Sequence, residues 1–304
     1  MSPRIETPMT ATVDTQLLSS MVRRPQSQTA IIVRQFRRSP TGMIGAVVML
    51  LLIGIALAAS VVAPYSPYTQ DFGAAMQPPS TAHWFGTDDV GRDILSRIIH
   101  GARISLRVGL IAVAIGGGLG VLLGTVAGFY GGWVDNVIMR FIDVLLAFPG
   151  LLLALAVVAV LGPGLFNIMI AVGIGGIPSY ARMARSTTLS IRERDYVLAA
   201  RAVGCSNPQI MLKYIVPNAI PPIIVLATLG VAGAILTAAG LSFIGVGARP
   251  PTPEWGAMLS SARLYIRQAW WLTTFPGLAI VVTVLAINMV GDSVRDALDP
   301  RLRQ

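Results

Sequence analysis

The stretch RSTTLSIRERDYVLAARAVGCSNPQIMLKYIVPN, residues 185–218, is a polar segment between two long apolar runs of the chain. It contains four arginines and one lysine. It has no metal-ligand cluster, no nucleophile beside a base and no phosphate-binding loop. These residue types predict a rigid cationic loop that another protein holds, and they do not predict a reaction centre.

The composition of the chain indicates where this loop lies. The 304 residues are 54% hydrophobic and 12% charged, with a mean hydropathy of +0.69. A soluble protein has roughly a quarter charged residues, so most of this chain faces lipid or other apolar segments. The net charge of +9 fits loops on an anionic membrane surface better than nucleic-acid binding. Cys205 is the only cysteine, which excludes an intrachain disulfide and a zinc site built on paired cysteines.

Six apolar runs are long enough to cross a bilayer, which takes about 20 residues of helix. They are residues 43–62, 104–129, 138–161, 165–183, 219–245 and 271–290. The predicted fold is therefore all-α and integral to the membrane, with six transmembrane helices.

The arginines and lysines predict the orientation of these spans. With the N-terminus inside, 16 of the 23 basic residues fall on the cytosolic side. The other seven fall outside or at the edge of the second span. Because cytosolic loops carry the excess of basic residues, we expect both termini and residues 185–218 in the cytosol. The protein is then a multi-pass protein of a bacterial-type cytoplasmic membrane.

The N-terminal leader is expected to have two parts. Residues 1–28 lack apolar periodicity and are predicted to be disordered. Residues 31–38, IIVRQFRR, are typical of a short helix at the membrane surface, although a plain basic topology anchor explains them equally well. We divide the chain into a cytosolic leader (1–35), a first span with its outer loop (36–104) and a core of five spans (105–304).

The second span carries a stripe of glycines. Gly116, Gly120, Gly124 and Gly128 recur at every fourth residue. Small residues at this spacing open one face of a helix, so that a neighbouring backbone can approach closely. The stripe predicts a helix-packing seam. A nucleotide-binding loop is excluded, because no strand precedes the glycines and neither GxGxxG nor a GK[ST] ending is present.

Residue patterns of enzymes and gradient-driven carriers are missing. The two histidines, His83 and His100, both lie between the first and second spans and lack the spacing of zinc ligands. Proton-coupled carriers usually place ionisable groups inside spans, whereas no span centre here holds a charge. The sequence therefore predicts a non-catalytic transport protein without a metal or cofactor site, whose energy source lies outside the chain.

The first half of the 185–218 loop predicts a short helix. Asp195 is placed to cap a helix over residues 196–203, with its carboxylate at the positive end. Ala199 and Ala200 keep the surface of this helix thin, so that a groove in a partner can close around it. Gly204 is placed to end the helix in a left-handed conformation.

The second half predicts another short helix. Asn207 and Pro208 fit the cap and the first residue of this helix, and Pro217 is expected to break it at the membrane. Together the two halves form an elbow rigidly joined to the fourth and fifth spans. An ordinary amphipathic cytosolic loop is the alternative that spacing alone leaves open.

At these residues the chain resembles a known family. Two alanines, a glycine four residues later and a closing Ile-Val-Pro at 215–217 are similar to the cytoplasmic coupling loop of ABC-type import permeases. Three further blocks resemble the second permease of the dipeptide, oligopeptide and nickel branch. They are FGTDDVGRDILSRIIHGARISL (85–106), LSFIGVGARPPTPEWGAML (241–259) and GDSVRDALDPRLR (291–303). The resemblance extends over residues 36–304.

The resemblance implies the fold of a type I ABC importer permease and a division of labour. A homologous second permease completes the pore, and an extracytoplasmic solute-binding protein delivers the cargo. Two cytosolic ABC ATPases bind ATP and Mg and grip the coupling loops, while this chain holds no cofactor. Its other partner is membrane lipid, and no nucleic acid is implied. ATP drives such a pore only if the closed ATPases fit one state of the loop better than the other.

Particular residues follow from the resemblance. The coupling loop is expected to act through Asp195, Tyr196, Ala199, Ala200, Arg201, Gly204, Pro208 and Pro217. Candidates for an outer gate or for docking of the binding protein are Asp88, Arg92, Asp93, Arg97, Pro251, Glu254 and Trp255. The alternative is that the outer residues have only a structural role, in blocks where Gly and Pro set the turns of the backbone.

One position departs from the family pattern. The coupling loop usually has a glutamate directly before the two alanines, and here that position is Leu198. Glu193 or Asp195 is the candidate for the missing carboxylate contact. The resemblance implies di- or oligopeptides as cargo, with a nickel or metal chelate or haem as the alternative. A gradient-driven carrier or channel, and an integral-membrane enzyme, are more remote alternatives.

Overall fold

The computed structural model describes residues 28–298, and these are helical throughout except for loops and one isolated bridge between Thr87 and Asp93. The predicted disorder of residues 1–28 lies outside the described residues, apart from Gln28, and so does the end of the block at 291–303. The all-α fold class is confirmed for the part of the chain that the structure describes.

The helices follow one another along the chain with short connections, except for the outer loop before α5. In order they are α2 (Gln28–Arg38), α3 (Pro40–Leu57), α4 (Ala59–Val62), η1 (Phe72–Ala74), α5 (Ile94–Tyr130), α6 (Gly132–Leu146), α7 (Gly150–Leu161), α8 (Leu165–Arg192), α9 (Asp195–Ala202), α10 (Asn207–Ile210), η2 (Met211–Ile215), α11 (Val216–Ile244), α12 (Trp255–Ala262), η3 (Arg263–Tyr265) and α13 (Trp271–Leu298).

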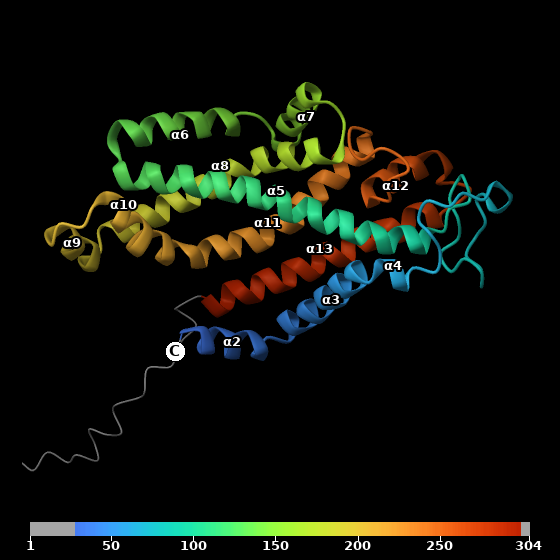
Figure 1. Cartoon of the computed structure of the whole chain (residues 1–304), viewed down its shortest axis with the longest axis horizontal. Coiled ribbons are helices and arrows are strands. Elements are labelled where there is room, and N and C mark those ends of the chain that lie inside the picture. Colours follow the sequence, from blue (N-terminus) through green and yellow to red (C-terminus); the bar gives the residue numbers. More distant parts are fainter. Residues whose placement is uncertain (1–27, 299–304) are drawn as a thin grey trace, which may run out of the picture.

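Figure 1 shows the long helices α5, α8, α11 and α13 running along the long axis of the molecule. Helix α3 lies beside α13, and α6 and α7 lie on the far side of α5 and α8. The short helices α9 and α10 are at one end of the bundle, and α12 is at the other. The elbow and the outer loops therefore lie at opposite ends, as a membrane-spanning bundle requires.

Four helical segments are long and apolar enough to span a membrane: α3, α5, the continuous run from α10 through α11, and α13. A fifth span exists if α6 and α7 are counted as one bent pair. Helix α8 has 28 residues but is not among these segments. Three arginines in its last eleven residues give it a more polar end. The six-span count is thus not confirmed by length and composition.

The third predicted span, residues 138–161, is wrong as a single straight helix. It is divided between α6 and α7, whose axes differ by 92°. Pro149 lies between them as the N-cap of α7. Proline offers no backbone N–H, and it disfavours helical backbone at the preceding residue, here Phe148. The chain therefore turns sharply at Pro149 instead of crossing directly.

The glycine stripe of α5 faces the backbone of α8. A Cβ atom added to Gly116 would lie 2.6 Å from the carbonyl oxygen of Gly173, and one added to Gly120 would lie 2.6 Å from that of Ile177. At Gly124 the added atom would meet the carbonyl oxygen of Ala181. The four-residue period of α5 thus matches a four-residue period on α8, and side chains at these positions would separate the two helices.

Candidate coupling loop and cavity

Helix α9 ends in a Schellman motif. The N–H of Cys205 donates to the carbonyl of Ala200 at 3.0 Å, and the N–H of Gly204 donates to that of Arg201 at 3.0 Å. Gly204 has φ +83°, in the left-handed region that favours glycine. The local sequence signal at Gly204 therefore has the backbone geometry that was expected of it.

Three details of the predicted elbow are wrong. The N-cap of α9 is Arg194, and Asp195 is its first helical residue without a side-chain cap bond. The second helix is capped one residue earlier than predicted, at Ser206, whose N–H bonds Oε1 of Gln209 at 3.0 Å in a capping box. Pro217 does not break the helix, which continues from α10 through the π-helical turn of η2 into α11.

The inner face of the elbow is packed against the end of the bundle. Ala200 and Val197 of α9 are buried with Ile210 and Ile215, and this cluster reaches Phe129 near the end of α5. The rings of Tyr196 and Tyr214 lie 6.4 Å apart and connect α9 to η2. The two short helices are therefore one packed unit, not a loose loop.

The outer face of the elbow is exposed and partly apolar. Val203 is 79% exposed and Leu212 is 68% exposed, and Tyr196 and Leu198 are also exposed. Ala199, Pro208 and Pro217 lie on the surface as well. Large apolar side chains are therefore exposed at several points around the elbow, where a protein partner can cover them.

Two arginines tie the elbow to α5, and sequence reasoning had not assigned these contacts. Nη1 of Arg192 donates to the carbonyls of Gly128 at 3.2 Å and Phe129 at 3.3 Å, which lie in the last turn of α5. Cationic groups are favoured at this negative end of a helix. The guanidinium of Arg201 lies 5.6 Å from the centre of the Phe129 ring. Arg201 thus connects α9 to α5, and Arg192 connects the last residue of α8 to the same end of α5.

The carboxylate expected beside the alanines has no obvious replacement in the elbow. Glu193 accepts from Nε of its neighbour Arg192 at 3.0 Å, at the end of α8. Leu198 itself is exposed. Glu193 therefore supports the arginine that holds α5, while the position of Leu198 is left for a partner to contact.

Two ion pairs connect α6 to α8 just before the elbow. Nε and Nη2 of Arg185 donate to the two carboxylate oxygens of Asp135 at 2.5 and 2.6 Å, and this carboxylate is largely buried. Nη2 of Arg182 donates to Asp143 at 2.8 Å, but both side chains are more than half exposed. The first pair is bidentate and shielded from water, and the second is not.

We expect Asp135→Asn to lower the free energy of unfolding by about 1–3 kcal/mol, because it leaves Arg185 with weakened charge-assisted hydrogen bonds. The matched control, Asp143→Asn, should cost about 0–1 kcal/mol, since exposed ion pairs contribute little. Denaturation midpoints of the purified variants measure both effects. A larger loss for Asp143→Asn than for Asp135→Asn would contradict the ranking.

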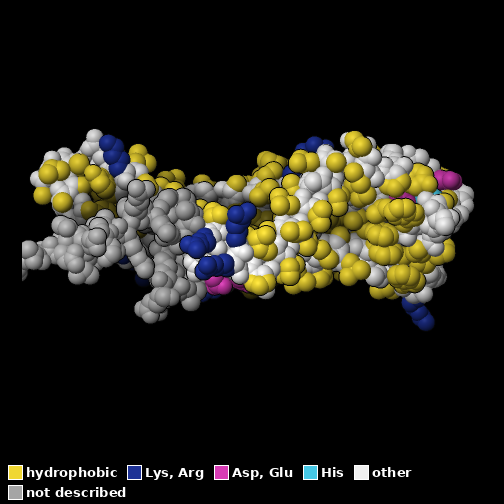
Figure 2. Space-filling model, turned by 90° about the horizontal axis from the view of Figure 1, so that it is seen from below, with side chains coloured by type: hydrophobic (Ala, Val, Ile, Leu, Met, Phe, Trp, Pro, Cys, Tyr) yellow, Lys and Arg dark blue, Asp and Glu magenta, His cyan; other side chains and the backbone are white. Residues whose placement is uncertain are grey.

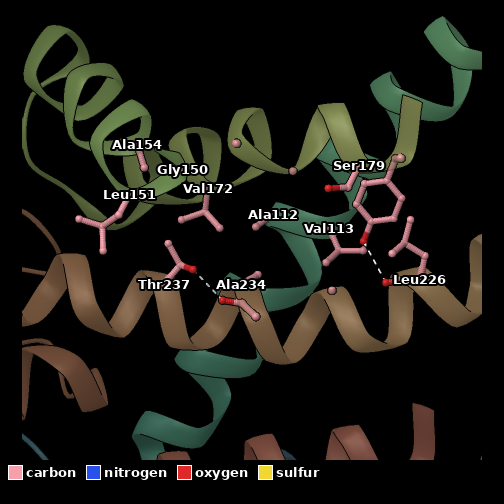
Figure 3. Close-up of a pocket in the computed structure, with 15 residues that line it drawn as sticks. Ala112, Val113, Gly150, Leu151, Ala154, Val172, Ser179, Leu226, Ala234 and Thr237 are labelled. Carbon is pink, nitrogen blue, oxygen red and sulfur yellow. Dashed lines mark hydrogen bonds between the residues drawn. The ribbon is translucent and has the colours of Figure 1, made fainter. Parts of the chain in front are cut away.

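A cavity of about 310 Å³ lies between α5, α7, α8 and α11 (Figure 3). Its lining holds no charged side chain and includes five glycines, Gly150, Gly175, Gly176, Gly230 and Gly233. The hydroxyl groups come from Ser179, Tyr180 and Thr237. Two of them are bonded to backbone, since Thr237 donates to Gly233 at 2.8 Å and Tyr180 donates to Leu226 at 3.5 Å. The lining suits a neutral polar solute better than a free ion.

The outer candidates come together, and all of them except the exposed Pro251 are buried. Asp88 accepts hydrogen bonds from the backbone N–H and Nε of Arg92 at 2.9 and 2.6 Å, and its Oδ2 lies 3.6 Å from Nε of Arg97. Asp93 caps α5 by accepting from the N–H of Ser96 at 2.8 Å. All four charged residues are buried, with at most 7% of their surface exposed. This burial favours the structural role over docking.

The same cluster joins two distant sequence blocks. Nη1 of Arg97 donates to the carbonyl of Pro251 at 3.4 Å, and the indole N–H of Trp255 donates to that of Ile98 at 3.1 Å. Glu254 caps α12 by accepting from Gly256 and Ala257. Burial raises the pKa of the Glu254 carboxyl, and its hydrogen bonds partly oppose this shift. These residues hold the outer end of the bundle together.

No group of three or more potential metal ligands occurs in the region from residue 28 to 298. The apolar helices, the packed elbow and the uncharged cavity together define the chain as a helical membrane protein. Comparisons with known proteins then specify the family.

Residues 120–304 match the family described as the binding-protein-dependent transport system inner membrane component, and residues 27–79 match the N-terminal TM domain of oligopeptide transport permease C. The chain belongs to this family of ABC importer permeases and to its dipeptide and oligopeptide branch. The resemblance found in the sequence is thereby confirmed. The chain is a membrane transport subunit and not an enzyme.

Curated relatives cover most of the chain. It is 46% identical over 270 residues to the dipeptide transport system permease protein DppC of Alkalihalophilus pseudofirmus, with 89% of each chain covered. It is 48% identical to the di/tripeptide transport system permease protein DppC of Pseudomonas aeruginosa, with 89% of this chain and 91% of the relative covered. It is 49% identical to the glutathione transport system permease protein GsiD of Escherichia coli, again with 89% of each covered.

A solved structure supports the fold. A chain of the MetNI methionine ABC transporter in an inward-facing conformation has a TM-score of 0.51 at 21% identity. The match covers 68% of this chain and 97% of that chain. At this identity the likeness concerns the fold alone.

Proposed function

We propose that this chain moves di- or oligopeptides across the bacterial cytoplasmic membrane, as one of two permeases in an ATP-driven importer. The relatives just described belong to dipeptide, di/tripeptide and glutathione systems. The uncharged cavity with its hydroxyl groups is compatible with the peptide-bond part of such a substrate, because peptide bonds are neutral and polar, but it does not pair the charged termini.

The observation that carries the proposed mechanism is the elbow of α9 and α10, which is rigid on its inner face and apolar on its outer face. We place it in the cytosol, where each of two ATPases holds one such loop. ATP and Mg stay on the ATPases. Closure of the ATPases then changes the position of α9, and Arg201 passes this change to the end of α5, to which Arg192 holds the end of α8. The acting residues are those assigned to the coupling loop, with Val203 and Leu212 added.

The remaining parts of the assembly follow from the same proposal. A homologous second permease closes the open side of the cavity, and an extracytoplasmic solute-binding protein brings the peptide to the outer end. Both termini lie in the cytosol. Six crossings result if α8 is a span despite its polar end and the bent pair of α6 and α7 counts as one.

Uptake by the complete complex in proteoliposomes tests the proposal. We expect accumulation of a radiolabelled peptide only when ATP, both ATPases and the loaded binding protein are present. Peptide is identified beforehand as the ligand that copurifies with the binding protein. Accumulation of nickel or haem with no response to peptide would assign the cargo to the alternative class. Uptake by this chain alone, driven by an ion gradient, would overturn the importer mechanism.

A further inference from the structure

A second cavity has an almost entirely apolar lining. This groove, which we call the α3 groove, has a volume of about 620 Å³ and lies between α3, α5, α11 and α13. Its lining includes Leu50, Ile53, Leu110, Val231, Ile287 and Val290. The only polar side chain in the lining is Thr228, and its hydroxyl already donates to the carbonyl of Ile224 at 2.9 Å. The groove offers no hydrogen bond and suits a hydrocarbon.

One end of the α3 groove lies next to the junction of α2 and α3. The hydroxyls of Ser39 and Ser293 are 2.9 Å apart, which fixes this junction against α13. Val290 of the groove lies three residues before Ser293, about 4.5 Å along the helix axis. A Cβ atom added to Gly42 would lie 3.4 Å from the ring of Phe36 and would clash with Ser293. Helix α2 is therefore packed at the mouth of the groove.

Helix α2 brings positive charge to this mouth. Arg34, Arg37 and Arg38 are exposed, and the ion pairs found among residues 28–298 involve none of them. The last turns of α13 add one arginine, Arg295, and two aspartates, Asp292 and Asp296, so positive charge stays in excess. Figure 2 shows dark blue side chains gathered where α2 lies, beside a hydrophobic surface that continues along the molecule.

We propose that the α3 groove binds an acyl chain of an anionic phospholipid, whose phosphate is held by the arginines of α2. The apolar lining matches the acyl chain, and the exposed guanidinium groups match the charge and geometry of a phosphate. Basic residues beside a membrane span attract the anionic lipids of the cytosolic leaflet. The lipid would fasten α2 and α3 to α11 and α13. This inference adds a lipid site to the proposed transport function and does not depend on which solute is moved.

Two matched pairs of variants test the site in the complete transporter complex. Leu50→Trp places an indole in the groove, whereas Leu57→Trp places one on nearly the same face of α3 two turns away, outside the lining. The two leucines are 69% and 70% exposed, so the exchanges are comparable on the surface. For the phosphate, Arg37→Gln with Arg38→Gln is compared with Arg267→Gln, an exposed arginine of the outer region.

The complexes are purified from vesicles of phosphatidylcholine and phosphatidylglycerol, and retained lipid is counted by native mass spectrometry. We expect the wild-type complex to retain phosphatidylglycerol in preference to phosphatidylcholine. Leu50→Trp should remove it and Leu57→Trp should not. The double arginine variant should reduce the preference for phosphatidylglycerol about tenfold, while Arg267→Gln should leave it unchanged.

Several results would overturn the proposal. One is equal retention by the Leu50 and Leu57 variants, and another is an unchanged lipid preference in the double arginine variant. A third is dissociation of the second permease by Leu50→Trp without loss of lipid, which would show that a helix of that partner fills the groove. Because retained lipid is measured without transport, failure of this inference is distinguishable from failure of the proposed peptide uptake.

Discussion

Gly204→Trp is expected to abolish ATP-driven uptake while the permease stays folded. A Cβ atom at Gly204 would meet nothing within 4 Å, so the isolated chain has room for the indole. In the proposed assembly the exposed face of the elbow is covered by an ATPase. There the bulky side chain should weaken the fit by about 1–3 kcal/mol, which is roughly 5- to 150-fold in affinity.

The backbone at Gly204 requires two controls for this prediction. Its φ of +83° strains any residue with a side chain, by about 1–2 kcal/mol. Gly204→Ala adds this strain without bulk, and Gly204→Asn tolerates the left-handed conformation better. ATPase stimulation by loaded binding protein and peptide uptake are measured for all three in proteoliposomes. Normal stimulation and uptake with Trp would rule out the coupling role, and equal losses with Ala and Trp would assign the effect to strain.

Gly124→Leu is expected to separate α5 from α8 and to destabilise the whole bundle. The new side chain would point at the backbone of Ala181, where even a Cβ atom meets the carbonyl oxygen. Overpacking of a tight contact costs about 1–3 kcal/mol. The cost should be near the upper end of this range, because the contacting atom belongs to the backbone of α8, which cannot move aside as a side chain can. We expect a large fall in the thermal denaturation midpoint and in the yield of monodisperse protein.

Gly118→Leu is the matched control on the same helix. A Cβ atom there would meet nothing within 4 Å, and the position is exposed. Leucine also has the better helix propensity, by roughly 0.8 kcal/mol. This variant should therefore be as stable as the wild type or slightly more stable. Equal destabilisation by the Gly118 and Gly124 variants would show that the stripe is not a packing seam.

The end of α9 was predictable from the sequence because its signals are local. A left-handed glycine and the two backbone bonds of a Schellman motif involve residues within one turn of each other. The caps were misplaced by one residue, at Asp195 and Asn207, because several polar residues compete for a cap and only the backbone geometry selects among them. The N-caps of the two short helices, Arg194 and Ser206, could therefore be identified only in the structure.

The membrane setting and the family were also determined by the sequence, through composition and through long blocks in a fixed order. Hydrophobicity depends on the residues alone, so it requires no knowledge of their neighbours. The bend at Pro149 was missed because a continuous apolar run conceals it, even though the proline itself was visible. The sequence showed the proline, but it did not show whether the proline or the apolar run would decide the path of the chain.

Only the tertiary structure showed which segments of the chain contact one another. The stripe of glycines on α5 was readable, but its match to the carbonyls of α8 depends on the relative height of two helices. The charged residues Asp88 and Arg97 were expected at the surface, and they are buried because a loop 154 residues away closes over them. The support of α5 by Arg192 and the α3 groove arise in the same way. Contacts between distant segments have no local signal, because they exist only after the helices have packed.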